Sequence, residues 1–149
     1  MEVALNQAKM AFELDEVPVG AVVVENGKIV AAAHNQNLTL KDPTAHAEIL
    51  VLREAAKKKG SDRLDNCDLY ATLEPCTMCC GAISLARIRR IYYAASDSKF
   101  GAVENGARFF SSSSCHHTPE IYSEIGGQES KKLLQSFFKK KRSSAARPK

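Results

Sequence analysis

The alternation of strand-like and helix-like segments is the feature that most constrains how this 149-residue chain can fold. Strands are predicted at 19–25, 28–34, 67–73 and 89–95, with a further short strand inside 117–125. Helices are predicted at 3–14, 45–59, 76–86 and 128–142, where apolar residues recur at helical spacing. Strands that alternate with helices indicate an α/β layered fold, in which helices pack on one central sheet.

Turn and cap residues mark the ends of these segments. Asn26-Gly27 joins the first two strands as a tight β-hairpin. Asp42-Pro43-Thr44 supplies capping oxygens and a proline suited to a first helical turn, and Gly60 ends the helix that follows. The buried stripe of that helix is expected to consist of Ala45, Ile49, Leu52 and Ala56.

The cysteine content favours a reduced protein with a metal site or a reactive thiol over a disulfide framework. The five cysteines are an odd number, and three of them crowd into 76–80. A chain of this length buries roughly 70% of its unfolded surface and needs no disulfide to fold. The first residues carry acids and no apolar signal segment, and no apolar run reaches the roughly 18 residues of a membrane span. We therefore expect a cytoplasmic, single-domain protein without a membrane segment, in which Cys67 is a free core thiol.

The net charge of +4 hides an uneven distribution. From Lys131 onward the chain has eight of its 21 basic residues and no acid, which leaves 13 bases against 17 acids, a net of −4, in the rest. Such a block is either a solvated helix face or an electrostatic contact for nucleic acid, and both interpretations stay open. We expect 1–142 to form one domain and 143–149 to be a disordered basic tail.

The stretch LEPCTMCC, residues 73–80, offers two thiol pairs for metal binding. Cys76 is three positions from Cys79 and four from Cys80, and both spacings place two side chains on one helix face, so periodicity does not choose between them. His46, at the start of an earlier helix, adds a nitrogen ligand. Three protein ligands with one open position are the arrangement of catalytic zinc, whereas structural zinc sites are closed by four.

Glu48 is expected to act beside the metal and not as a ligand. It stands two residues after His46, and side chains at i and i+2 on a helix point in different directions. A neutral imidazole and two thiolates balance the charge of Zn²⁺, which lowers the pKa of a bound water toward about 7. Glu48 is then placed to shuttle the proton of that water.

The motif His-x-Glu followed by Pro-Cys-x-x-Cys resembles the signature of the zinc-dependent deaminases. The stretches EVPVGAVVV, DPTAHAEI and TLEPCTMC resemble, more narrowly, the bacterial tRNA-specific adenosine deaminase family, over nearly the whole chain from about Leu5 to Arg142. The resemblance implies a three-layer cytidine-deaminase-like fold, with a mixed sheet of about five strands flanked by helices. It also implies one zinc ion per subunit, held by His46, Cys76 and Cys79, with Glu48 as the catalytic acid and base.

The same resemblance implies contacts with RNA. Asn35 matches an asparagine that contacts the target base, and Asp97 and Lys99 match a loop that contacts the nucleotides around it. Phe137 and Phe138, which precede a run of four basic residues, resemble the family's last helix, which packs against the RNA loop. The implied partners are a tRNA anticodon loop, from arginine tRNA in bacterial members, and a second copy of the chain in a homodimer.

The activity implied is hydrolytic deamination of adenosine to inosine at the wobble position, by zinc-bound hydroxide with Glu48 as proton shuttle. The bases of an anticodon loop are unpaired, so extruding one into a pocket costs little unstacking. One alternative is a deaminase of a free base or nucleoside, such as guanine or cytosine, because it needs the same metal site. The other is a noncatalytic zinc-containing tRNA-binding subunit, which would have no use for Glu48.

Three other features compete with this assignment. Cys80 stands where the family has a small residue, and we expect it to be buried in packing, with a ligand role as the alternative. Cys115-His116-His117 is a weaker candidate for a second metal site. It lies in the long irregular segment 96–118, and a loop of that length is more often functional than idle. His34 is expected to be a packed or rim residue beside Asn35.

Overall fold

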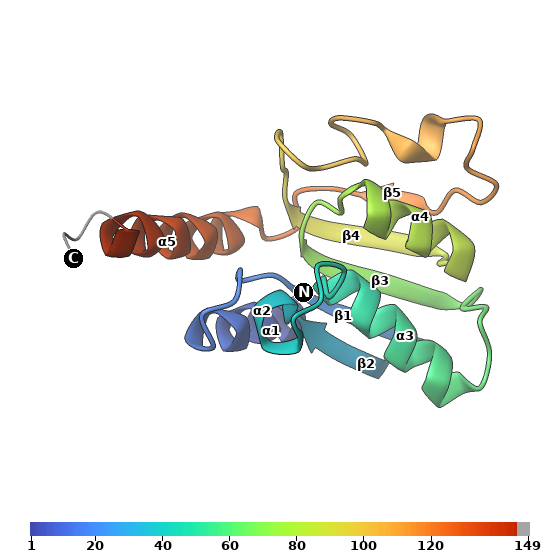
Figure 1. The fold of residues 1–149 in the computed structure, drawn as a ribbon. Coiled ribbons are helices and arrows are strands. Elements are labelled where there is room, and N and C mark those ends of the chain that lie inside the picture. The colour runs from blue at the N-terminus through green and yellow to red at the C-terminus, as the bar shows by residue number, and fades with distance from the viewer. Residues whose placement is uncertain (146–149) are drawn as a thin grey trace.

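Residues 1–145 are described by the computed structural model, and they form a five-stranded sheet with helices on both faces (Figure 1). The strand order is β2-β1-β3-β4-β5. β1 is antiparallel to β2 and β3, whereas β3, β4 and β5 run parallel to one another. The predicted mixed sheet of about five strands is therefore confirmed. The strands are β1 (Gly20–Glu25), β2 (Lys28–His34), β3 (Cys67–Leu73), β4 (Arg90–Ala95) and β5 (Glu120–Tyr122).

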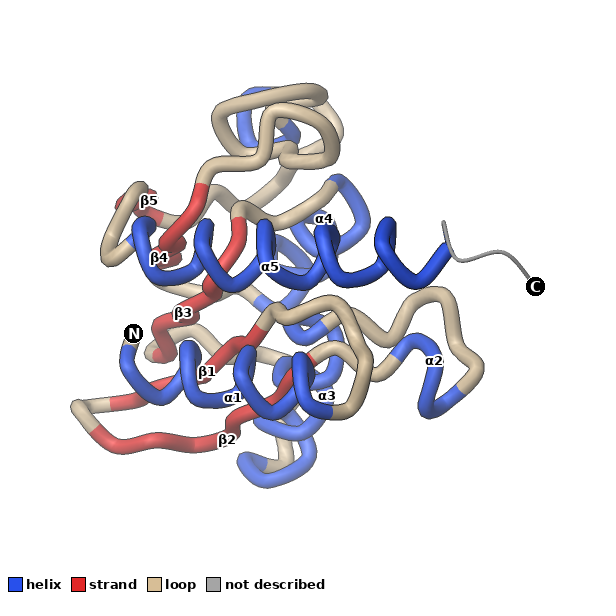
Figure 2. Tube along the Cα trace, turned by 90° about the vertical axis from the view of Figure 1, so that its left-hand side faces the viewer, coloured by secondary structure: helices blue, strands red, loops and turns tan. Residues whose placement is uncertain are grey.

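The helices make two outer layers. Figure 2 shows α1 and α5 lying side by side across one face of the sheet, with α3 and α4 behind it. This is the three-layer arrangement that the resemblance implied. Within residues 1–145, every helix is too short or too polar to cross a bilayer. The helices are α1 (Glu2–Glu13), α2 (Asn37–Leu40), α3 (Ala47–Lys59), α4 (Thr77–Ala86), the 3₁₀ turn η1 (Phe109–Ser111) and α5 (Gly127–Ala145).

The main core lies between the sheet and the α3/α4 layer. Alternate residues of the central strands point into it, as the two-residue period of a strand requires, and Val23, Leu69 and Ile91 are each at most 1% exposed. Ala45, Ile49 and Leu52 are buried as predicted, although Ala45 precedes α3, which begins two residues later than predicted. The last position of the predicted stripe is wrong. Ala55 is fully buried, whereas Ala56 is only partly buried. The next residue after Leu52 to face the core is therefore three positions along the helix and not four.

Close packing of α1 on the sheet depends on Gly20. A Cβ on Gly20 would lie 2.0 Å from the carbonyl oxygen of Ala4 and 2.7 Å from the amide nitrogen of Ala8. Its own amide donates to the hydroxyl of Thr72 on the neighbouring strand, at 3.0 Å. Only glycine lets the helix and the strand approach this closely.

Two elements differ from prediction for reasons outside their own sequence. The single turn α2 was not predicted, and its first amides are capped by the buried carboxylate of Glu16, which accepts from Leu38 and Thr39 at 2.8 and 2.9 Å. α5 continues to Ala145, three residues past the predicted end at Arg142. The rest of the predicted tail, 146–149, lies outside the described residues.

Candidate active site

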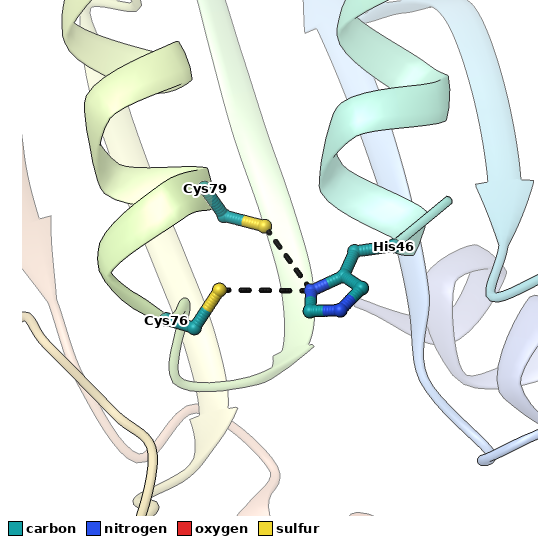
Figure 3. A group of neighbouring side chains, drawn as sticks. All are labelled: His46, Cys76 and Cys79. Atoms are coloured by element: carbon teal, nitrogen blue, oxygen red, sulfur yellow. Dashed lines mark hydrogen bonds between the residues drawn. The ribbon is translucent and has the colours of Figure 1, made fainter. Parts of the chain in front are cut away.

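Two helix N-termini bring the predicted ligands together. His46 immediately precedes α3, and Cys76 immediately precedes α4, so both stand where helix dipoles favour negative charge. Figure 3 shows the three side chains of His46, Cys76 and Cys79 pointing toward one another. Each sulfur lies 3.6 Å from Nδ1 of His46, and the three donor atoms lie within 4.8 Å of one another. His46 and the two cysteines, which follow it by 30 and 33 positions, thus form a compact set of donors suited to a metal ion.

The two thiols differ in how easily they ionise. The pKa of Cys76 is lowered to about 4, chiefly by the adjacent Cys79 thiol and also by His46. The pKa of Cys79 is raised, because its thiol lies beside Cys76 and is buried. Two adjacent thiolates repel each other unless a cation lies between them. The pair therefore favours a bound cation as the partner that permits both to ionise.

Glu48 lies against this donor set without belonging to it. It is 4% exposed, and its Oε2 accepts a hydrogen bond from the Cys79 thiol at 3.1 Å. Burial raises the pKa of its carboxyl above the ordinary value. A carboxyl with a raised pKa beside a metal site can take up a proton and return it, as a general acid–base residue must.

Asn35 is fixed in orientation by the start of α3. Its Oδ1 accepts the amide hydrogen of Ala47 at 2.7 Å. The amide can only donate, so the oxygen of the side chain is the atom that faces it. Within residues 1–145, the Nδ2 group of Asn35 makes no hydrogen bond, and the residue lines the pocket. Asn35 therefore presents a donor to the pocket.

A pocket of about 680 Å³ opens beside these residues. His46, Glu48, Asn35 and Cys76 form its polar part, and Val17, Val19 and Leu73 provide apolar walls. The loop after β4 contributes Asp97, Lys99 and Phe100, and α5 contributes Leu134 and Phe138. A pocket of this size with apolar walls and a few convergent polar groups is suited to a flat heterocycle.

Glu74 holds the loop after β4 in place, and its role was missed from the sequence. The side chain is 2% exposed and accepts six hydrogen bonds. One oxygen accepts from Asp97, Ser96 and the Asn105 side chain, and the other from the amides of 103–105. Burial alone raises the pKa of Glu74, but the hydrogen bonds from Asp97 and Asn105 outweigh it and keep the pKa below the ordinary value.

The same loop packs directly on the turn at Pro75-Cys76, which carries one of the candidate ligands. Gly101 forms an isolated antiparallel bridge with Cys76, and the next amide, from Ala102, donates to Pro75 at 2.9 Å. A Cβ on Gly101 would lie 2.5 Å from the Glu74 carboxyl carbon. The position of Glu74 in the sequence could have indicated this role, because an acidic residue stands between a buried strand and a proline. A charge buried at such a place needs several hydrogen-bond donors around it.

Asp97 and Lys99 differ in their surroundings: the carboxylate of Asp97 is hydrogen-bonded within the loop, whereas the side chain of Lys99 is exposed. Oδ1 of Asp97 accepts the amides of Lys99 and Phe100, each at 3.0 Å, so this carboxylate shapes the turn that carries them. The Lys99 side chain is exposed, and its Nζ lies 5.2 Å from the centre of the Phe100 ring. Phe100 was not predicted as a site residue, although it is 66% exposed and lines the pocket.

Phe137 and Phe138 were predicted together, but the structure separates them. Phe137 is 3% exposed and packs edge-on against Phe12 of α1, with ring centres 6.0 Å apart. A ring buried in this way cannot stack on a base while α5 keeps its position. Phe138 is 45% exposed and lines the pocket, so it is the member of the pair that remains available to a substrate.

The competing clusters do not join the donor set. Cys80 is fully buried in the core and its thiol points to the carbonyl of Pro75 at 3.6 Å. Cys115 and His117 bond to backbone oxygens, and among residues 1–145 no other group of three donors comes within metal-binding distance. His34 is buried, with Nδ1 2.9 Å from the carbonyl of Asn35. Cys67 is a free, buried thiol, as predicted.

The fold and the donor set define a deaminase, and the sequence profile of the MafB19-like deaminases matches residues 1–142. The chain belongs to that family, and it also belongs with the tRNA-specific adenosine deaminases. It is 55% identical over 142 residues to the tRNA-specific adenosine deaminase of Agrobacterium fabrum, covering 95% of this chain and 93% of the relative.

Solved structures agree with this assignment. One from a study of A-to-I editing by tRNA:A34 deaminases at the wobble position of transfer RNA superposes with a TM-score of 0.89 at 55% identity, covering 90% of this chain and 97% of the other. The guanine deaminase of Bacillus subtilis is more distant, with a TM-score of 0.63 at 31% identity, covering 99% of this chain and 94% of the other. The fold is thus shared by enzymes with different substrates.

Proposed function

We propose that this protein hydrolytically deaminates adenosine to inosine at the wobble position of a tRNA. The observation that carries the proposal is the buried Glu48 carboxylate in contact with the His46–Cys76–Cys79 donor set at the pocket. That arrangement joins a metal site to an acid–base residue. The similarity to tRNA-specific adenosine deaminases supports adenosine in tRNA as the substrate.

Zinc is the metal that the donor set fits. With zinc–nitrogen bonds of roughly 2.0–2.1 Å and zinc–sulfur bonds of roughly 2.3 Å, a tetrahedral ion separates a nitrogen from a sulfur ligand by about 3.6 Å. Both Nδ1–Sγ distances are 3.6 Å. One nitrogen and two sulfur ligands leave a fourth position open, as in catalytic zinc sites. Zinc, one ion for each subunit, would supply Lewis acidity that activates water.

The remaining steps fall to residues of the chain. Asn35 would donate through Nδ2 to a ring nitrogen of the adenine and hold the base against Glu48. Glu48 would take one proton from the attacking water and deliver it to N1 as the oxygen adds to C6. It would then transfer the remaining proton of that C6 hydroxyl to the amino group, which leaves as ammonia. The apolar walls formed by Val17, Val19 and Leu73 exclude bulk water around the base.

A tRNA anticodon loop fits the surroundings of the pocket. Its bases are unpaired, so one can enter the pocket at little cost. The exposed basic residues Lys139, Lys140 and Arg142 follow Phe138 along α5 and would lie near the phosphates. We further propose that the substrate is arginine tRNA, that residues 1–142 form the catalytic domain and that the protein is cytoplasmic. We also propose that it forms a homodimer, because Met78 and Leu85 on α4 leave apolar surface exposed.

The experiment compares purified, zinc-loaded protein on an unmodified arginine tRNA and on free adenosine, guanine, cytosine and cytidine. Inosine should form in the tRNA alone. The similarity to a guanine deaminase makes guanine the second candidate substrate. Turnover of a free base without inosine in the tRNA would refute the proposed substrate while leaving the metal site intact. Zinc without turnover of any substrate would favour a noncatalytic tRNA-binding subunit.

A further inference from the structure

Phe100 exposes an aromatic ring on the loop after β4, whose backbone is fixed by hydrogen bonds. The ring is 66% exposed, yet its amide is bonded to Asp97, and the turn behind it is tied down through Glu74. Isolated apolar residues on a surface need no explanation by themselves. An exposed ring on a fixed loop, however, has already lost most of its conformational entropy. Binding a partner through it therefore costs less ordering free energy.

The surroundings of the ring point to nucleic acid as its partner. Phe100 and Phe138 both line the pocket that holds Glu48, one from the loop after β4 and the other from α5. The ammonium of Lys99 lies 5.2 Å from the Phe100 ring centre, so a positive charge stands over one face of this exposed ring. Single-stranded nucleic acid is bound by this combination, in which rings stack on bases and cations track the phosphates.

We propose that Phe100 stacks on the nucleobase next to the target adenosine and thereby holds the loop open for base extrusion. The inference rests on the proposed function, since it requires an RNA substrate. When the target base turns into the pocket, its neighbour loses a stacking partner. Phe100, at the pocket edge, replaces that partner, whereas the base itself is held by Asn35 and lies beside Glu48. Phe100 is thus a substrate-binding residue outside the catalytic machinery.

The test pairs protein variants with altered RNA. Anticodon stem-loops carry adenosine at the wobble position, and two further versions lack the base immediately 5′ or 3′ of it. Stacking on an aromatic side chain contributes about 1–3 kcal/mol per base, so Phe100→Ala should raise KM for the intact loop about tenfold. The value of kcat at saturation should stay within about twofold, and Phe100→Trp should restore KM.

The abasic loops identify the contact. On the loop that lacks the stacked base, Phe100→Ala and the unaltered protein should have the same KM, and on the other abasic loop the tenfold difference should persist. Ile29→Ala is the matched control, because Ile29 is 54% exposed, apolar and at the opposite end of β2 from Asn35. It should leave KM unchanged on every loop.

Three results would overturn the inference. Phe100→Ala could leave KM unchanged, or raise it equally on all three loops. It could instead lower the molecular mass measured by light scattering, which would show that the ring covers a second copy of the chain. If the unaltered, zinc-loaded protein forms no inosine in any loop, the proposed function itself fails and this inference fails with it.

Discussion

Replacing Glu74 by glutamine should destabilise the protein by about 2–5 kcal/mol, a large effect for a change of one oxygen to an amide. The carboxylate accepts six hydrogen bonds, three on each oxygen. If the amide oxygen of Gln keeps the three backbone amides of 103–105, its NH₂ group faces the other three donors. Ser96 can rotate its hydroxyl and Asn105 can turn its amide, but the backbone amide of Asp97 loses its acceptor.

The magnitude follows from these contacts. An orphaned buried amide costs about 1–3 kcal/mol. The three retained bonds change from charge-assisted to neutral, which loses roughly 1 kcal/mol for each at most. The loop can relax toward solvent, which keeps the total below the full sum. A loss of this size is a substantial share of the 5–15 kcal/mol that stabilises a typical domain.

Urea unfolding of Glu74→Gln and Glu104→Gln provides the measurement. Glu104 lies in the same loop but accepts only one side-chain hydrogen bond, from the Tyr93 hydroxyl, and an amide oxygen can still accept it. Glu104→Gln should therefore cost less than about 1 kcal/mol. Zinc content should not change in either variant, while KM for tRNA should rise in Glu74→Gln because the turn bearing Lys99 loosens. Equal stability of the two variants, within about 0.5 kcal/mol, would refute the reasoning.

The pH dependence of the difference gives an independent check. The folded-state pKa of Glu74 lies below its ordinary value of 4.5. The carboxylate's contribution to stability is therefore complete above that ordinary value and is lost as the pH falls through the folded-state pKa. The gap in unfolding free energy between the unaltered protein and Glu74→Gln should narrow in acid. A gap that stays constant below pH 4.5 would contradict the depressed pKa.

Other predictions follow from the site and from α5. Glu48→Gln should retain zinc and lose about 10²–10⁴ or more in kcat, measured by inosine formation, and retained activity would rule out the proton-transfer role. Cys79→Ala should lose the metal while Cys80→Ala keeps it, as elemental analysis will show; the reverse result would assign the wrong thiol pair. Replacing Lys139 and Arg142 by glutamine should flatten the salt dependence of tRNA binding by up to about 1.4 in logarithmic slope. The same change at the distant exposed residues Lys28 and Lys57 should leave that slope unaltered, and equal slopes for both variants would argue against phosphate contacts on α5.

The sequence by itself determined the elements and the chemical types of the site. The hairpin turn at Asn26-Gly27 and the helix start after Pro75 depend on local backbone preferences, so they are visible in short stretches. The helix predicted from Ala45 begins instead at Ala47, whose amide is held by Oδ1 of Asn35 and not by the capping residues predicted at 42–44. The motif likewise indicated one nitrogen ligand, two sulfur ligands and a separate carboxylate. Each of these signals is a short local motif, although the two motifs of the site, at 46–48 and 75–79, lie about 30 positions apart.

Tertiary structure decided which of those residues meet. Cys79 faces His46 and Cys80 faces the core because α4 packs on the sheet in one orientation about its own axis. The spacing of the cysteines along the sequence does not fix that orientation. Phe137 is buried and Phe138 is exposed because α1 lies beside α5 on one face of the sheet. Glu74 gains its six partners only when the loop after β4 folds back over the turn at Pro75-Cys76. Local preference sets helices and turns, whereas the orientation of one element against another depends on packing between distant segments, and the substrate pocket is made from that packing.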